Sequence, residues 1–252
     1  MTNLKRITFI CLLTGALSPV SAGVFALAPV DDTYVYSGEP SIPHGDVSVI
    51  ATGYDFPHTE GGWISYLKFD LSGIPSDQVI TGATLNLYQV LGAGYAQIGT
   101  DLFHIDNDTW NENTLTWNNQ PLGFTPYGTP VLGTLIASNP NGFSYVGWSA
   151  WNLFEKSAWN AAADQKDGFL SLQLAEMYLG TQTHDWCSTE SDLTNCLAPG
   201  ETGPATESRR PYLTITTAVV PLPQAIYLFG FGIIGLIRMT FRKRSRECHR
   251  MG

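Results

Sequence analysis

The chain has 252 residues, a length that accommodates one all-β sandwich or barrel domain together with terminal signals. Charged residues make up only 14%, whereas 25 glycines, 15 prolines and a 12% aromatic share are typical of many short strands joined by tight turns. The formal net charge of −9 disfavours nucleic acid as a partner, because it repels the phosphate backbone. The composition therefore predicts a single all-β domain that does not bind nucleic acid.

The first 22 residues have the three parts of a secretion signal peptide. Lys5 and Arg6 form a positively charged start, and an apolar run too short to cross a bilayer follows as far as Leu17. Val20-Ser21-Ala22 then offers small residues at a cleavage site. We expect residues 1–22 to be removed when the chain is exported through the Sec pathway.

The cations are concentrated in the two terminal segments. Of the 13 Lys and Arg, two lie in the signal peptide and six lie after residue 237, which leaves five in the body. Of the 22 Asp and Glu only Glu247 lies outside the body, so five cations against 21 acids give the body a net charge of −16. Such a charge favours solubility and the uptake of divalent cations.

The four cysteines also indicate export. Cys11 lies in the signal peptide and Cys248 in the tail, which leaves Cys187 and Cys196 as an isolated pair in a loop-like stretch. In an oxidising compartment such a pair is expected to form a disulfide. A metal site is the less favoured alternative, because it needs more thiol or imidazole ligands than His184 alone would add.

Alternating apolar and polar residues indicate strands along the body. In residues 63–71, one face of an extended chain is apolar and the other is polar, which predicts a half-buried strand. The apolar side chains are those of Leu67, Phe69 and Leu71, and the opposite ones are those of Tyr66, Lys68 and Asp70. The same period of two predicts further strands in residues 83–88, 170–174 and 213–216.

One segment has the spacing of a helix instead. In residues 148–163, apolar side chains recur three or four positions apart at Trp151, Phe154 and Ala158, which predicts one short helix lying against the sheets. Asp167-Gly168 is expected to turn the chain into the next strand.

Four segments of the body resemble a known family when they are taken together. They are Asp31-Asp32-Thr33-Tyr34-Val35, then YLKFDLSGIPSDQVITGATLNLY from Tyr66, then WNENTLTWNNQP from Trp110, and finally RRPYLTI from Arg209. In this order and at this spacing they resemble the DNRLRE family of secreted domains over residues 30–217. The resemblance implies a jelly-roll-like β-sandwich of antiparallel strands, found in surface proteins and polysaccharide-active enzymes and in part classed as carbohydrate-binding modules.

The resembling segments contain candidate ligand-binding residues. An exposed aromatic ring stacks on the apolar face of a sugar, and neighbouring polar groups bind the hydroxyls. The candidates are Trp110, Trp117, Asn118, Arg209 and Arg210. The structural alternative stays open, in which the tryptophans fill the core and one arginine pairs with Glu190 or Asp32 to hold the last strand to the first.

No sequence motif requires a cofactor, but a structural calcium ion is an open alternative. Its candidate ligands are Asp31, Asp32, Asp106 and Asp108. An EF-hand loop starting at Asp106 is excluded, because Asn111 and Trp117 stand where glycine and glutamate are required.

Catalytic motifs are missing from the sequence. It contains no Gly-x-Ser-x-Gly elbow, no His-Glu-x-x-His pair and no phosphate-binding loop. Pairs of carboxylates arise by chance among 21 acids, so they do not identify a glycosidase. Three hypotheses follow: a carbohydrate-binding module, a structural protein of the cell surface or matrix, and, least favoured, a glycan-degrading enzyme.

Residues 220–252 have the parts of a membrane anchor. The apolar run Ala225–Ile237 is shorter than the roughly 20 residues of a full span, but an extension to Phe241 just crosses the bilayer. The cluster Arg242-Lys243-Arg244 is expected to stay in the cytoplasm, which leaves the body outside the inner membrane. This pattern predicts a single C-terminal transmembrane helix.

The same segment resembles a more specific signal. Val220-Pro221-Leu222-Pro223, followed by a glycine-containing apolar helix and a basic end, resembles the PEP-CTERM sorting signal in its Val-Pro-Leu-Pro variant. The resemblance implies that a membrane protease, the exosortase, cuts near the motif and sends the protein to the cell envelope, surface or extracellular matrix. A permanent membrane anchor remains the alternative.

Overall fold

The computed structural model describes residues 22–55, 61–94, 99–126, 129–138, 145–176, 182–205 and 207–220. The expected signal peptide lies almost wholly outside these ranges, as do the sorting motif beyond Val220, the transmembrane segment and the basic cluster. Among the described helices, none has both the length and the hydropathy that a bilayer span requires. The contacts within the chain define a compact unit that ends at Ala218.

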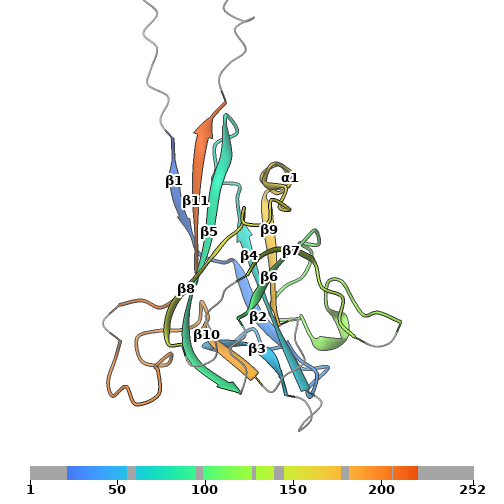
Figure 1. Ribbon diagram of the computed structural model, residues 1–252, viewed down its shortest axis with the longest axis vertical. Coiled ribbons are helices and arrows are strands. Elements are labelled where there is room, and N and C mark those ends of the chain that lie inside the picture. The colour runs from blue at the N-terminus through green and yellow to red at the C-terminus, as the bar shows by residue number, and fades with distance from the viewer. Residues whose placement is uncertain are drawn as a thin grey trace, which may run out of the picture. The chain divides into compact units, whose positions relative to one another are not determined.

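Eleven strands, one α-helix and one short 3-10 turn make up the described part of the chain (Figure 1). The strands are β1 (Val24–Leu27), β2 (Asp31–Tyr36), β3 (Val49–Asp55), β4 (Gly61–Asp70), β5 (Gln78–Gly94), β6 (Asp101–Ile105), β7 (Thr134–Ser138), β8 (Gly147–Asn152), β9 (Phe169–Ala175), β10 (Gln182–Cys187) and β11 (Tyr212–Val219). The helix is α1 (Ala161–Asp167), and the 3-10 turn is Trp117–Asn119. The prediction of an all-β fold with one short helix is confirmed.

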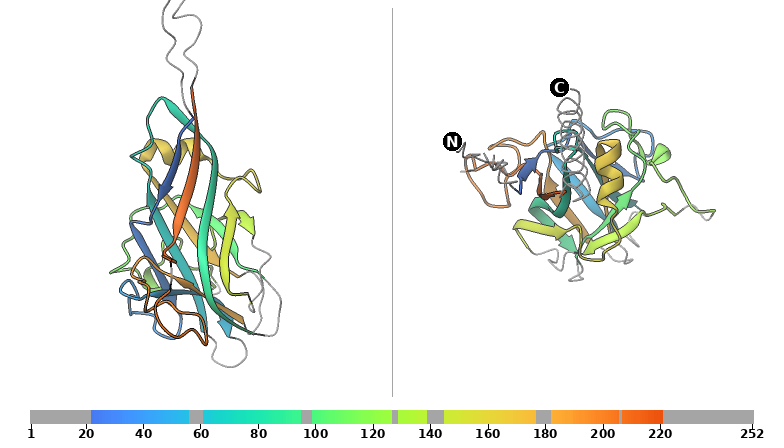
Figure 2. Two further views of the ribbon diagram at one scale, coloured as in Figure 1. Left: turned by 90° about the vertical axis from the view of Figure 1, so that its left-hand side faces the viewer. Right: turned by 90° about the horizontal axis from the view of Figure 1, so that it is seen from above.

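The strands form one antiparallel network that curls on itself. Its order is β1-β11-β5-β10-β3-β4-β9-β6-β7, while β2 also pairs with β4 and β8 also pairs with β5. One layer contains β2, β4, β9, β6 and β7, and the facing layer contains β1, β11, β5 and β8 (Figure 2). Strands β3 and β10 connect the layers, because β3 pairs with the start of β4 and β10 pairs with the end of β5.

The main core lies between these two layers. The apolar faces predicted from the alternation are buried here, including those of β4, β5, β9 and β11. Fully buried members are Leu67, Phe69, Leu85, Leu87, Leu170, Leu172, Leu174, Leu213 and Ile215. Trp151 and Trp186 close the core with rings 5.3 Å apart in an edge-to-face arrangement.

The opposite face of β4 is also buried, so the prediction of a half-buried strand is wrong. A second core contains Tyr66, Phe103, Ile105, Trp110 and Leu115. It forms because the chain after β6 folds back over the sheet and covers the face that the alternation assigned to solvent. Tyr66 is therefore fully buried, and Lys68 is only 7% exposed.

The predicted helix over residues 148–163 is also wrong. Gly147–Asn152 is strand β8, paired with Thr84–Gln89 of β5, and the α-helix starts only at Ala161. Within β8, buried Ser149 and Trp151 alternate with exposed residues, a period of two that the helical spacing concealed. The predicted turn at Asp167-Gly168 is confirmed: Gly168, at φ 95°, caps α1 in the left-handed conformation that favours glycine, and β9 follows.

The loop after β10 is closed by a covalent bond. Cys187, the last residue of β10, forms a disulfide with Cys196, and both side chains are buried. The predicted disulfide is confirmed. It holds residues 188–195 against the end of the sheet near the start of β3, where Ser188 donates from its backbone to the carbonyl of Ser48.

Candidate functional site

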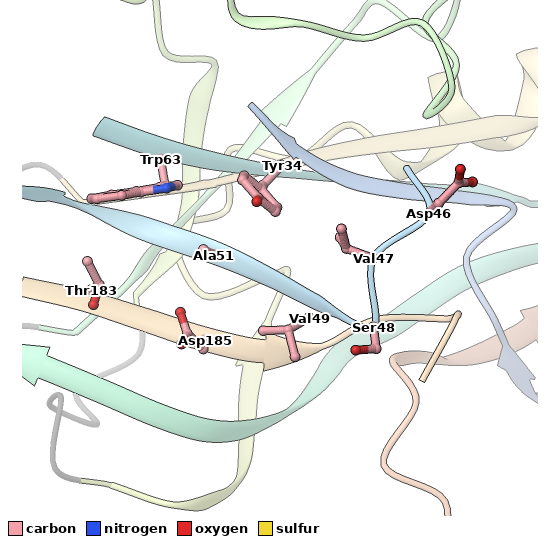
Figure 3. A pocket seen from close by; sticks show the side chains of 9 residues that line it. All are labelled: Tyr34, Asp46, Val47, Ser48, Val49, Ala51, Trp63, Thr183 and Asp185. Carbon is pink, nitrogen blue, oxygen red and sulfur yellow. The ribbon is translucent and has the colours of Figure 1, made fainter. Parts of the chain in front are cut away.

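A groove of about 720 Å³ lies where β2 and β4 meet β3 and β10 (Figure 3). Its lining comes from four strands and the loop before β3. The residues are Tyr34, Asp46, Val47, Ser48, Val49, Ala51, Trp63, Thr183 and Asp185. Figure 3 shows the aromatic side chains of Tyr34 and Trp63 along one side, and Thr183 and Asp185 along the other.

Side chains along β3 and β10 alternate between the core and the groove, which places Thr183 and Asp185 on the polar side of the groove. Ile50 and Trp186 point into the main core and are fully buried. Their neighbours Ala51 and Asp185, which pair across the two strands, point the other way and line the groove. The two strands therefore present one face to the core and the other to the groove.

Small residues leave room between the aromatic and the polar side. In register, Trp63 of β4 pairs with Gly53 of β3, and Gly53 pairs with Thr183 of β10. Gly53 has a φ of 142°, a conformation that favours glycine, so no side chain stands between the two walls at this point. Ser65 donates from its hydroxyl to the carbonyl of Ala51 at 2.7 Å and fixes β3 against β4.

The aromatic wall is held by stacking. The ring of Tyr36 packs flat against the indole of Trp63, with centroids 4.7 Å apart and planes 1° apart. The ring of Tyr34 stacks in the same way on the imidazole of His44 at 4.4 Å. These contacts fix the orientation of the two rings that line the groove.

The charged side chains that line the groove are acidic. Burial raises the pKa of Asp185 to about 6, and the neighbouring His184 opposes that rise. Burial also lowers the pKa of His44, which stacks on Tyr34, against the opposing effect of Glu39. The groove thus combines aromatic rings, hydroxyls and carboxylates, a set of groups that suits the apolar faces and hydroxyls of a sugar.

The sequence-predicted tryptophan loop lies elsewhere and is mostly structural. Trp110 is 7% exposed and donates from its indole to the hydroxyl of Ser171 at 3.1 Å, so it belongs to the second core. Trp117 is half-buried beside Phe124, with ring centroids 5.9 Å apart. Asn118 is exposed and donates to the hydroxyl of Ser41 at 3.0 Å. These three residues do not line the groove.

The two arginines stabilise the disulfide-closed loop. Arg209 forms a two-pronged ion pair with Glu201, both N···O distances being 2.7 Å, and its guanidinium stacks 4.3 Å over the ring of Tyr88. Arg210 donates to the carbonyl of Ser191 at 2.7 Å. The alternative in which one of the two arginines pairs with Glu190 or Asp32 is wrong, because Arg209 pairs with Glu201 and Arg210 binds a backbone carbonyl instead.

A separate cluster of three carboxylates is the candidate cation site. Asp32, Glu112 and Glu190 each offer an oxygen within 4.8 Å of the others. Asp32 is 1% exposed and accepts hydrogen bonds from the hydroxyl and backbone N–H of Thr189, at 2.6 and 2.9 Å. One oxygen of Glu190 is buried without a hydrogen-bond partner among the described residues. Such oxygens are the ligands that calcium prefers.

The charges of this cluster repel one another. Burial, with a contribution from Glu190, raises the pKa of Asp32 to about 7. Burial also raises the pKa of Glu112, although the backbone N–H of Asp32 donates to its carboxylate at 3.0 Å. A divalent cation would relieve this repulsion.

Of the four sequence-predicted cation ligands, only Asp32 belongs to this cluster. Asp31 instead pairs with Lys68 at 2.6 Å. Asp106 is exposed near His104, and neither Asp106 nor Asp108 is a member of the cluster. The ligand set predicted from the sequence did not include Glu112 and Glu190, because residues this far from Asp32 in the chain have no spacing that marks them as its neighbours.

Comparison with known proteins agrees with the chemistry of the groove. Residues 24–150 match the model of carbohydrate-binding module family 96, a range that includes Tyr34, Asp46 and Trp63. A gellan lyase from Bacillus sp is 31% identical over 123 residues, which are 47% of this chain but 4% of the lyase. The chain thus spans a small part of that enzyme's length. Because the family model covers half of its residues, the chain belongs to carbohydrate-binding module family 96.

Proposed function

We propose that this protein is an exported, non-catalytic binding protein that holds or organises polysaccharide through the groove at β2, β4, β3 and β10. The observation that carries the proposal is the position of Trp63 and Tyr34 opposite Thr183 and Asp185 in one groove. Membership of a carbohydrate-binding family supports the same ligand class. The rings would stack on sugar faces, while the hydroxyls and carboxylates would accept hydrogen bonds from sugar hydroxyls.

A binding role also fits what the sequence lacks. A glycosidase needs two carboxylates across a cleft in acid and base roles, and no catalytic motif accompanies the acids of this chain. The similarity to gellan lyase covers 4% of that enzyme, so it transfers no reaction to this chain. The alternative of a glycan-degrading enzyme predicts that the protein releases reducing ends from exopolysaccharide. We expect no such release in a reducing-sugar assay.

The proposed destination is the cell envelope or extracellular matrix. The expected signal peptide, the disulfide and the body charge of −16 all suit an exported protein. We further propose that the motif Val220–Pro223 directs an exosortase to the precursor while a transmembrane helix holds it in the inner membrane. The alternative is a structural surface protein held permanently by this helix.

The binding proposal is tested by retention on insoluble polysaccharides and by affinity electrophoresis in soluble ones. Trp63→Ala removes one wall of the groove and is expected to weaken binding by about tenfold or more, since a stacked aromatic contributes on the order of 1–3 kcal/mol. Trp117→Ala is the matched control, because Trp117 is half-buried but lies outside the groove. Loss of binding in the control but not in Trp63→Ala would place the site in the tryptophan loop instead.

A further inference from the structure

The strands β11, β5 and β8 have a second face, here called the outer face, that points away from the main core. β8 pairs with one side of β5, and β11 lies on the other side. Leu85, Trp151 and Leu213 are buried in the core, so their neighbours along each strand point outward. The short outward side chains are those of Thr84, Asn86, Ala150, Asn152, Thr214 and Thr216. The left view of Figure 2 shows this layer turned toward the viewer.

The outer face carries no charge, although the body carries many. The body has 21 acids and five cations, yet none of them stands in residues 84–88, 148–152 or 212–216. A second copy of this chain is a poor occupant for the face, because two bodies with a net charge of −16 repel each other. The threonine hydroxyls and asparagine amides of the face offer both donors and acceptors, which suits a ligand covered with hydroxyls.

Three aromatic rings form a row across one end of the outer face. Tyr88 of β5 contacts Trp148 of β8 edge to face, with centroids 5.4 Å apart. Trp148 in turn contacts Tyr212 of β11 in the same way at 5.3 Å. Tyr212 is 36% exposed, and the other two rings are half-buried. The row thus places exposed ring surface beside hydroxyls and amides, a combination that suits the apolar face and the hydroxyls of a sugar.

Neighbouring contacts hold the row in place before any ligand arrives. The guanidinium of Arg209 stacks 4.3 Å over the ring of Tyr88, and its charge is matched by Glu201. The hydroxyl of Tyr145 donates to the backbone carbonyl of Trp148 at 2.7 Å. Because the rings are already ordered, a ligand that binds them loses little free energy to fixing side chains.

We propose that the outer face is a second glycan-binding surface, on which a polysaccharide chain lies against the row of Tyr88, Trp148 and Tyr212. None of the residues of this face lines the groove, so one molecule binds two chains and cross-links them. The chemistry recognised is a pyranose ring with an apolar face and hydroxyls, which neutral and acidic polymers share. This inference rests on the proposed function and adds a second site to it.

The test is affinity electrophoresis of the full-length protein in a neutral β-glucan and, separately, in polygalacturonate. Trp63→Ala serves as the background, because it weakens the groove. In that background, Tyr212→Ala is expected to weaken binding at least about threefold, since it removes a stacking ring. Ala150→Glu should also weaken binding, because it places a charge on the outer face and leaves the rings intact. Phe169→Ala is the matched control, since Phe169 is 39% exposed on β9 and belongs to neither site.

Light scattering of the retained polymer measures cross-linking, and melting curves confirm that each variant folds. We expect larger particles with the unaltered protein than with Trp63→Ala or Tyr212→Ala. Binding in the Trp63→Ala background that neither Tyr212→Ala nor Ala150→Glu weakens overturns the inference. A dimer in sedimentation velocity that Ala150→Glu dissociates also overturns it, because the face then binds a second copy. If Trp63→Ala has no effect while Tyr212→Ala abolishes binding, the proposed groove fails and the outer face alone binds the glycan.

Discussion

Lys68 shows how a polar residue is stabilised inside this fold. Its ammonium group pairs with Asp31 at 2.6 Å, donates to the carbonyl of Trp110 at 2.5 Å and lies 4.8 Å from the centre of that indole ring. The side chain is 9% exposed, so water does not replace these partners. Lys68 thereby fastens the start of β2 and the loop after β6 to the same face of β4.

Replacing Lys68 by methionine is expected to lower the free energy of unfolding by about 3–5 kcal/mol, because the buried carboxylate of Asp31 loses its partner. Urea unfolding followed by tryptophan fluorescence measures the change. Lys156→Met is the matched control, since that lysine is 41% exposed and its pair with Glu155 should contribute less than about 1 kcal/mol. Equal effects of the two substitutions would contradict the structural role of Lys68.

The buried carboxyl of Asp32 is expected to make the protein less stable as the pH rises. Its pKa is raised from 3.8 to about 7, chiefly by burial, so the folded chain binds this proton more tightly than the unfolded chain. The resulting stabilisation is complete below pH 3.8 and is lost as the pH rises to about 7. The urea concentration at the unfolding midpoint, measured without divalent cations, should therefore fall as the pH rises from 3.8 to about 7. The fall should be smaller in the variant Asp32→Asn.

His104 acts in the same direction at higher pH. Burial lowers the pKa of His104. The hydrogen bond to Asp164 at 2.9 Å and the nearby carboxylates together raise that pKa by more than burial lowers it, so the pKa lies above 6.5. Stability from this pair is complete below pH 6.5 and is lost as the pH rises through the raised pKa. A urea midpoint that rises between pH 4 and pH 8 would contradict both assignments.

At the scale of elements, the carboxylate cluster connects three segments. Asp32 belongs to β2, Glu112 to the loop after β6 and Glu190 to the disulfide-closed loop. The three carboxylates come from segments far apart in the sequence, so they repel one another only when folding brings the three segments together. A bound cation would therefore join the strand to both loops.

Calcium is expected to raise the melting temperature, and a chelator should reverse the rise. A ligand at about 100 times its Kd stabilises the folded state by about 2.7 kcal/mol. The effect should be larger at pH 8 than at pH 5, because binding requires the ionised form of Asp32. Differential scanning calorimetry of the protein and of Glu112→Gln measures it, with Asp77→Asn as the control.

The same measurement has a clear negative result. A melting temperature that is the same with calcium and with chelator at pH 8 would show that the cluster binds no calcium. A rise that survives in Glu112→Gln would place the ion at other residues.

At the scale of the whole molecule, we propose that the chain combines an all-β unit of a carbohydrate-binding family with terminal sorting segments. We expect the mature protein to lack residues 1–22 and the apolar segment after the motif Val220–Pro223, because signal peptidase and exosortase would remove them in turn. Intact-mass spectrometry of the native protein tests both cleavages together. A mature protein that retains residues 229–237 would instead support a permanent anchor. The matched control replaces Pro221 and Pro223 by alanine, which tests whether the cleavage depends on the motif.

The sequence by itself determined the features that depend on local pattern. Alternation located the strands at residues 63–71, 83–88, 170–174 and 213–216, and the isolation of Cys187 and Cys196 determined the disulfide. These succeeded because the side-chain period of a strand and the pairing of two lone cysteines need no knowledge of distant neighbours. The helical spacing in residues 148–163 misled, because it joined Trp151, which belongs to β8, to Phe154, which lies beyond the end of that strand at Asn152.

Only the tertiary structure decided what covers each face and which distant residues meet. Tyr66 and Lys68 look solvent-facing by alternation, yet a loop some forty residues later buries both, as the contact of Lys68 with Trp110 shows. The groove takes Tyr34, Trp63 and Asp185 from three strands, and the carboxylate cluster takes Asp32, Glu112 and Glu190 from three segments. Burial and site formation depend on the pairing of remote strands, and no local pattern of residues contains that information.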